Sequence, residues 1–210
     1  MRDRNAPLTA ADIPDLAWEK MGGLIPAAVQ DASSLQLLML GYMNEEALRQ
    51  TLESGLVTFY SRSKDRLWTK GETSGNHLKV VAVLPDCDND ALLVRADPVG
   101  PTCHLGTDSC FTDEGPDGVG WLARLARIVA ERASADPKDS YTARLLKEGP
   151  SRVAQKIGEE GVEVALAGAG GTREECIDET ADLLYHLTVL MQARSFGWDD
   201  VTARLKERHK

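Results

Sequence analysis

The chain has 210 residues, with 24 Lys and Arg against 33 Asp and Glu and a formal net charge of −9 at pH 7. This length suits two small domains or one large one, and the acidic balance argues against general nucleic-acid binding, which needs a basic surface. No apolar run approaches the roughly 18 residues of a membrane span, and the first 17 residues lack the apolar core of a signal peptide. We therefore expect a cytoplasmic protein that binds neither nucleic acid nor membranes.

Short apolar runs separated by turn residues dominate the first half of the chain. They are typical of β-strands, and we expect five, at residues 24–30, 35–40, 57–60, 78–84 and 91–95. A helix over 45–54 interrupts them, since Asn44 is a suitable N-cap and Gly55 a natural terminator. Glu45 and Glu46 suit the positive start of that helix. The predicted order is β-β-α-β-β-β, an α+β domain that is mainly β.

The second half of the chain has helical periodicity. A Gly/Pro/Asp-rich stretch over 112–118 marks the change and is typical of a linker. From Trp121 onward the apolar residues recur at helical spacing. We expect an α+β domain over 1–113, a linker over 114–120 and an all-α domain over 121–210.

Two helices of the second half are expected to form an antiparallel hairpin. Gly149-Pro150-Ser151 is suited to start the first helix, and Thr172 with Glu175 forms a capping-box signature for the second. Between them, Gly168-Ala169-Gly170-Gly171 is expected to form a loop. Such a short connection places the two helices side by side.

The hairpin carries acidic residues at matching heights. One helical turn of the first helix holds three of them, and two more stand at i, i+3 on the second, as Glu159, Glu160, Glu163, Glu179 and Asp182. A buried group of carboxylates needs cations to neutralise it, and Mg²⁺ suits oxygen ligands. The alternative is a solvated acidic face. Gly158 and Gly161 lie inside the first helix, where glycine is less favourable than alanine. Their presence suggests that something needs to approach the helix closely there.

Three of the four cysteines, Cys87, Cys103 and Cys110, lie within 24 residues. In a reducing compartment clustered thiols are metal ligands or catalysts more often than disulfides, although a Cys103–Cys110 disulfide is the alternative. Three thiolates with an open position suit a catalytic Zn²⁺. The open position can hold water with His104 beside it as a base, or His104 can close the site.

The run Asp86-Cys87-Asp88-Asn89-Asp90 alternates carboxylates with a thiol. In an extended chain, successive side chains face opposite ways. The three aspartates would then share one face as hard ligands for Mg²⁺, while Cys87 would point away as a soft ligand for Zn²⁺. Pointing away, Cys87 is placed to reach a partner subunit, so that a dimer would share the zinc. The alternative is an acidic turn at the end of a strand.

These residues are parts of two longer patterns. The first half resembles phosphoribosyl-AMP cyclohydrolase, through Gly23–Asp31, Met39–Asn44, Ser61–Ser63, Leu67–Gly75, the aspartate run and the Cys-His-x₅-Cys segment. The second half resembles phosphoribosyl-ATP pyrophosphohydrolase, an all-α relative of the nucleotide pyrophosphatases, through Glu159-Glu160-x-x-Glu163 and Glu179-x-x-Asp182. The resemblance spans about residues 18–209, and the two halves together look like the bifunctional enzymes of histidine biosynthesis.

The resemblance implies a set of metal sites. In the first half, Mg²⁺ would be bound by Asp86, Asp88 and Asp90. Zn²⁺ would be bound by Cys103 and Cys110 together with Cys87, which would come from the other subunit of a homodimer. In the second half, Mg²⁺ would be bound by Glu159, Glu160, Glu163, Glu179 and Asp182.

Other residues are candidates for handling the substrate. His104 adjoins Cys103 and is our candidate for proton transfer; the alternative is a buried, hydrogen-bonded histidine with no catalytic role. The basic island Arg62, Lys64, Arg66 and Lys70 is suited to capture phosphate, and we assign substrate binding to Ser61, Arg62, Ser63 and Lys70. Asn76 follows Ser74-Gly75 where many cyclohydrolases have histidine, so no catalytic role is assigned to position 76 or to His77.

By this resemblance, the second half would hydrolyse phosphoribosyl-ATP to phosphoribosyl-AMP and pyrophosphate, and the first half would open the adenine ring of phosphoribosyl-AMP. One alternative is a zinc-dependent nucleotide deaminase fused to a house-cleaning pyrophosphatase, but the deaminase signature His-x-Glu with Pro-Cys-x-x-Cys is absent from the sequence. Another is a non-catalytic, zinc-stabilised dimerisation module, which would want a fourth fixed ligand.

Overall fold

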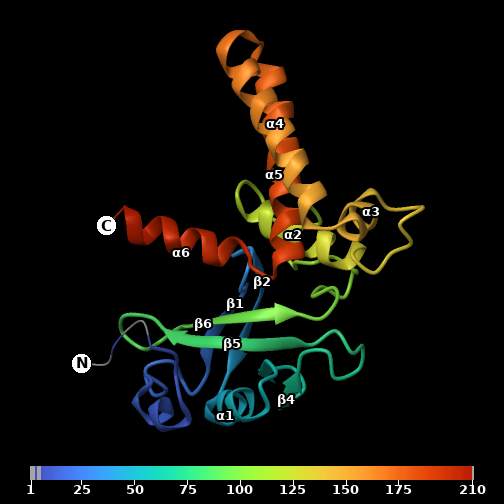
Figure 1. Cartoon of the computed structure of the whole chain (residues 1–210). Helices are drawn as coiled ribbons and strands as arrows, with labels where there is room; N and C mark the ends of the chain where they lie inside the picture. Colours follow the sequence, from blue (N-terminus) through green and yellow to red (C-terminus); the bar gives the residue numbers. More distant parts are fainter. Residues whose placement is uncertain (1–2, 4–5, 210) are drawn as a thin grey trace. The chain divides into compact units, whose positions relative to one another are not determined.

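The computed structural model describes residue 3 and residues 6–209, which divide into two compact units at the Gly120–Trp121 bond (Figure 1). Residues 1 and 210, where the two predicted domains begin and end, lie outside the described residues. Across the described ranges, no helix combines the length and the apolar character needed to cross a bilayer.

A four-stranded sheet in the order β2-β1-β6-β5 is the centre of the first unit. Its strands are β1 (Ile25–Asp31), β2 (Leu37–Met43), β5 (Leu78–Pro85) and β6 (Leu92–Pro98), and a 3-10 helix, η1 (Ala10–Asp15), precedes them. β1 pairs antiparallel with β2 and parallel with β6, while β5 and β6 are antiparallel. Ile25, Ala27 and Val29 alternate along β1 and are fully buried, so the core of the unit lies against one face of the sheet.

The predicted helix is confirmed as α1 (Glu45–Ser54). The Asn44 side chain accepts a hydrogen bond of 2.8 Å from the backbone N–H of Ala47, and Gly55 ends the helix in the left-handed conformation at φ 70°. Both caps are local interactions between neighbouring residues, which is why sequence spacing was sufficient to predict them.

The first unit contains a strand that the sequence did not predict. β3 (Thr58–Ser61) pairs with β4 (Arg66–Thr69) as a separate antiparallel hairpin, with Ser61 opposite Arg66. The residues of β4 are only partly buried or exposed, so this strand lacks the apolar alternation that marks a half-buried strand. The first unit therefore has six strands among its described residues, one more than the five predicted.

Residues 86–90 form a turn between β5 and β6, and the predicted extended conformation is wrong. The Asp86 carboxylate accepts hydrogen bonds from the backbone N–H groups of Asp90 (3.0 Å) and Ala91 (3.3 Å), and Asn89 has φ 63°. Aspartate and asparagine favour such reversals. Cys87 Sγ lies 3.8 Å from Asp88 Oδ1, so Cys87 does not face away from its acidic neighbours.

The second unit is all helical, as predicted. Its helices are α2 (Gly120–Arg132), α3 (Tyr141–Glu148), α4 (Pro150–Gly170), α5 (Arg173–Arg194) and α6 (Trp198–Arg208). α4 and α5 pack side by side as an antiparallel hairpin (Figure 1), and Thr172 and Glu175 form the predicted capping box. Val129, Leu145, Val153 and Val189 form the buried core of the unit.

Two predictions about glycines in this hairpin are wrong. The stretch 168–171 is not a loop, because α4 continues to Gly170 and only Gly171 and Thr172 join the helices. Packing of α4 along α5 overrides the weak helix propensity of glycine. A Cβ atom at Gly158 or Gly161 would meet nothing within 4 Å, so no close approach inside the chain requires glycine at either position.

Candidate functional site

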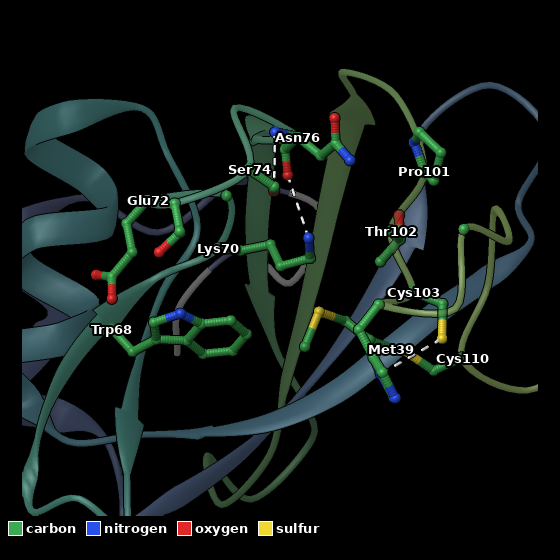
Figure 2. A pocket seen from close by; sticks show the side chains of 14 residues that line it. Met39, Trp68, Lys70, Glu72, Ser74, Asn76, Pro101, Thr102, Cys103 and Cys110 are labelled. Atoms are coloured by element: carbon green, nitrogen blue, oxygen red, sulfur yellow. Dashed lines mark hydrogen bonds between the residues drawn. The ribbon is translucent and has the colours of Figure 1, made fainter.

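The first unit contains a pocket of about 480 Å³ beside the Cys103 and Cys110 thiols (Figure 2). This volume lies within the usual range of small-molecule sites. The lining comes from the chain around β4, from the loop after β6 and from β2, and comprises Met39, Trp68, Lys70–Ser74, Asn76, Pro101–His104, Gly106 and Cys110.

Cys103 and Cys110 both line this pocket, and a hydrogen bond links their side chains. Hydrogen bonds from the Leu105 backbone and the Thr107 side chain lower the pKa of the Cys103 thiol, whereas burial raises the pKa of the Cys110 thiol. All four cysteines have free thiols, so the alternative Cys103–Cys110 disulfide is not formed. The two sulfur atoms are adjacent, and the lowered pKa of Cys103 favours its thiolate form. Such a pair suits a soft metal such as Zn²⁺.

Cys87 belongs to a different cluster. Its sulfur and the carboxylates of Asp86 and Asp88 offer ligand atoms that all lie within 4.8 Å of one another. Among the described residues of this one chain, no group of three such ligand atoms joins Cys87 to Cys103 and Cys110. A single copy of the chain therefore brings together two of the three predicted zinc ligands.

Lys20 forms ion pairs with two aspartates of the acidic turn at residues 86–90. Lys20 Nζ lies 2.6 Å from Asp88 Oδ2 and 2.5 Å from Asp90 Oδ2, and this contact lowers the pKa of Asp88. Lys20 precedes β1 and lies 68 positions before Asp88, so no local pattern could identify it. Two carboxylate oxygens thus converge on one positive group, and their oxygen chemistry fits Mg²⁺.

Lys70 places a positive charge in the pocket. It is 8% exposed, and its Nζ donates a hydrogen bond of 3.2 Å to the Asn76 carbonyl (Figure 2). Burial lowers the pKa of Lys70, and the nearby Cys110 and Cys103 thiols oppose this effect. His104 Nδ1 lies 3.8 Å from Cys103 Sγ. His77 Nδ1 bonds the Lys70 carbonyl at 2.9 Å and so supports the pocket wall.

The predicted substrate-binding residues Ser61, Arg62 and Ser63 lie at the turn between β3 and β4. They are not among the described residues that line the pocket. Arg62 stacks on the Tyr42 ring at 3.9 Å, and the Ser61 and Ser63 hydroxyls lie 3.5 Å apart. Of the basic island, Arg66 forms an ion pair with Glu72 at 2.5 Å.

Gly71 shapes the pocket wall and provides a test of it. A Cβ at Gly71 would lie 2.5 Å from the Asn76 carbonyl, at φ 86°. We expect Gly71→Ala to destabilise the first unit by about 2–5 kcal/mol, combining a left-handed alanine with overpacking, as measured by urea unfolding. Gly75→Ala is the matched control, because φ there is 78° but nothing lies within 4 Å. Equal losses for the two variants would show that the wall tolerates the extra methyl group.

In the second unit, Glu160, Glu179 and Asp182 offer carboxylate oxygens within 4.8 Å of one another. Glu163 contacts Glu160, and this contact raises the pKa of Glu163. The predicted convergence across the hairpin is therefore confirmed for four of the five carboxylates. Oxygen donors this close fit a hard cation, because their mutual repulsion would otherwise oppose ionisation.

Glu159 lies outside this group and is held by neighbours on its own helix. It accepts hydrogen bonds from Gln155 (2.8 Å) and Lys156 (2.9 Å). Lys156 Nζ also lies 2.7 Å from Glu160 Oε1 and lowers the pKa of Glu160. Lys156 and Glu160 thus form an ordinary i, i+4 ion pair. Glu160 is at the same time a member of the acidic group.

Sequence reasoning missed one buried residue at this group. His186 is 5% exposed and lies one helical turn after Asp182. The i, i+4 spacing from Asp182 is a signal that could have identified it.

Comparisons with known proteins match a family to each of the two units. The family model described as Phosphoribosyl-AMP cyclohydrolase matches residues 39–112, and the one described as Phosphoribosyl-ATP pyrophosphohydrolase matches residues 122–209. The chain is 56% identical over 203 residues to the histidine biosynthesis bifunctional protein HisIE of Escherichia coli strain K12, covering 97% of this chain and all of that protein. It is 54% identical over 207 residues to the protein of that name from Vibrio parahaemolyticus, covering 96% and 98%. The chain therefore belongs to the family of bifunctional histidine-biosynthesis hydrolases, with a phosphoribosyl-AMP cyclohydrolase region followed by a phosphoribosyl-ATP pyrophosphohydrolase region.

Proposed function

We propose that the second unit releases pyrophosphate at divalent cations, Mg²⁺ in particular, held by Glu160, Glu163, Glu179 and Asp182 together with Glu159, which would have to leave its hydrogen bonds to Gln155 and Lys156. The observation that carries this proposal is the convergence of three carboxylate oxygens within 4.8 Å, with Glu163 beside them. Bound Mg²⁺ would neutralise phosphate charge and orient the attacking water. The chain itself supplies the carboxylates, with Lys156 holding Glu160 ionised.

For the first unit we propose a zinc site made by Cys103 and Cys110 of one chain and Cys87 of a second copy. Cys103 and Cys110 lie together at the pocket, whereas Cys87 lies in the acidic turn. Zinc bound there would polarise a water for attack on the adenine ring. The site is then complete only in a homodimer, and its thiols would require a reducing compartment such as the cytoplasm.

We assign the remaining residues of the first unit to substrate and Mg²⁺. Lys70 faces the pocket and is proposed to hold the substrate phosphate, with Ser61, Arg62 and Ser63 as further contacts. His104 is proposed to move the proton, since it lies beside Cys103. Asp86, Asp88 and Asp90 are proposed to bind Mg²⁺, which would have to displace Lys20 from two of them.

Subunit complementation tests the shared zinc site. We expect Cys87→Ala and Cys103→Ala proteins each to lack ring-opening activity and to recover about one quarter of it when equal amounts are unfolded and refolded together. Half of the dimers are then mixed, and each mixed dimer has one intact site. Ring opening of phosphoribosyl-AMP is measured by absorbance.

Mixing Cys103→Ala with Cys110→Ala is the matched control. These two ligands would come from one chain, so no mixed dimer regains an intact site. Failure of the Cys87 mixture to recover activity would refute a site shared between subunits.

A further inference from the structure

His186 occupies a fixed orientation inside the second unit. Its Nδ1 donates a hydrogen bond of 2.8 Å to the backbone carbonyl of Asp182, one turn earlier on α5. Because a carbonyl only accepts, Nδ1 carries the proton in the neutral ring. The other nitrogen, Nε2, is then an acceptor and lies 3.3 Å from the Tyr141 hydroxyl of α3.

The same side of the ring that bonds Asp182 faces Glu160. His186 Nδ1 lies 3.7 Å from Glu160 Oε1, and Glu160 is only 4% exposed. This distance exceeds a hydrogen bond, so the ring limits where the carboxylate can sit rather than bonding it directly. Lys156 Nζ contacts the same oxygen at 2.7 Å. Glu160 Oε1 is therefore enclosed by groups from its own helix and from α5.

A second contact joins α3 to α5, and it does not involve Glu160. The Thr142 hydroxyl of α3 lies 2.8 Å from the Tyr185 hydroxyl of α5, and the Tyr141 and Tyr185 rings stack with centroids 6.2 Å apart. Both tyrosine rings also lie edge-on to the His186 ring, with centroids 6.1 and 5.1 Å away, whereas the contact between the Thr142 and Tyr185 hydroxyls does not involve His186. This hydroxyl contact provides the structural baseline against which a specific effect of His186 on Glu160 can be measured.

We propose that His186 is a positioning residue for pyrophosphate release, which holds the Glu160 carboxylate in the orientation that receives the divalent cation. This inference rests on the proposed metal-binding role of Glu160. Mg²⁺ demands near-ideal octahedral geometry, so a carboxylate free to rotate binds it less well. Groups that orient metal ligands are typically worth 10- to 100-fold in metal affinity or activity.

Two substitutions distinguish the contacts of the two nitrogens of the His186 ring. His186→Asn places an amide N–H where Nδ1 was and loses the partner of Tyr141, whereas His186→Gln places its amide near Nε2 and loses the group that faces Asp182 and Glu160. We expect His186→Gln to weaken Mn²⁺ binding at this site by about 10- to 100-fold. His186→Asn retains most of the affinity.

Mn²⁺ binding to the full chain is measured by electron paramagnetic resonance. The same titration of Glu179→Gln protein supplies the contribution of other sites. The Mg²⁺ concentration for half-maximal pyrophosphate release should rise in parallel for His186→Gln. Tyr185→Phe is the matched control, because it removes a hydroxyl contact between α3 and α5 and leaves the surroundings of Glu160 intact.

The proposal is overturned if His186→Gln and His186→Asn have equal Mn²⁺ affinities, or if His186→Gln lowers only the melting temperature, which is the result expected of Tyr185→Phe. The Glu160→Gln variant distinguishes this inference from the proposed metal-binding role of Glu160, on which the inference rests. Retention of pyrophosphate release by Glu160→Gln would remove the proposed role of Glu160 itself. Loss of that activity, with an unchanged metal requirement in His186→Gln, would remove only the role of His186.

Discussion

Glu163→Gln is expected to lose pyrophosphate release from phosphoribosyl-ATP while keeping ring opening of phosphoribosyl-AMP. Glu163 contacts Glu160 and lies beside Glu179 in the acidic group of the hairpin. The amide keeps the size of the side chain but removes the charge that attracts a divalent cation. Because groups that merely orient metal ligands are worth 10- to 100-fold, loss of a ligand should lower kcat/KM by more than about 100-fold. Coupled-enzyme detection of pyrophosphate provides the measurement.

Glu174→Gln is the matched control for this experiment. Glu174 lies in the first turn of α5, is exposed, and has a long ion pair of 3.7 Å with Arg173. It should retain full pyrophosphate release. Loss of both activities in Glu163→Gln would contradict the assignment of the two reactions to separate units, and retention of both would exclude Glu163 from the metal site.

Cys103→Ala is expected to release zinc and to abolish ring opening while pyrophosphate release continues. Cys103 is 9% exposed at the pocket wall and interacts with Cys110. Removing its sulfur leaves two of the three proposed ligands, too few to hold a catalytic zinc. Zinc bound per chain, measured by elemental analysis after dialysis, should fall to near zero together with the ring-opening rate.

Cys176→Ala controls for the loss of a thiol in the same protein. Cys176 is a partly buried residue of α5, and we expect its replacement to leave zinc content and both activities unchanged. Full ring opening by zinc-free Cys103→Ala protein would refute a catalytic zinc. Retained zinc without activity would instead assign Cys103 to the chemistry rather than to metal binding.

Features set by neighbouring residues were predictable from the chain alone. The caps of α1 and α5, the start of α4 and the order of the predicted elements follow from contacts between residues only a few positions apart. The acidic group of the hairpin was also predictable, because two helices joined by a short turn must bring equidistant positions together. β4 escaped prediction, since a partly exposed strand has no strong apolar alternation.

The acidic run at residues 86–90 shows where pattern was insufficient. Alternating side chains favoured an extended strand, but the Asp86 carboxylate bonds the backbone four and five residues later and reverses the chain. Lys20, distant in sequence, then pairs with Asp88 and Asp90. An aspartate side chain that competes for backbone N–H groups can replace a strand by a turn, and residue alternation carries no information about that competition.

Motifs and helical spacing were enough to identify the two regions and their order, and to select charged and sulfur-containing residues as candidates for each site. Tertiary structure was needed to show which of these groups meet. It separates Cys87 from Cys103 and Cys110 within one chain, buries Lys70 beside two thiols, and encloses Glu160 between Lys156 and His186. The physical reason is that ligand atoms and ion pairs interact over only a few ångströms, and distances of that size between remote residues depend on packing rather than on spacing along the chain.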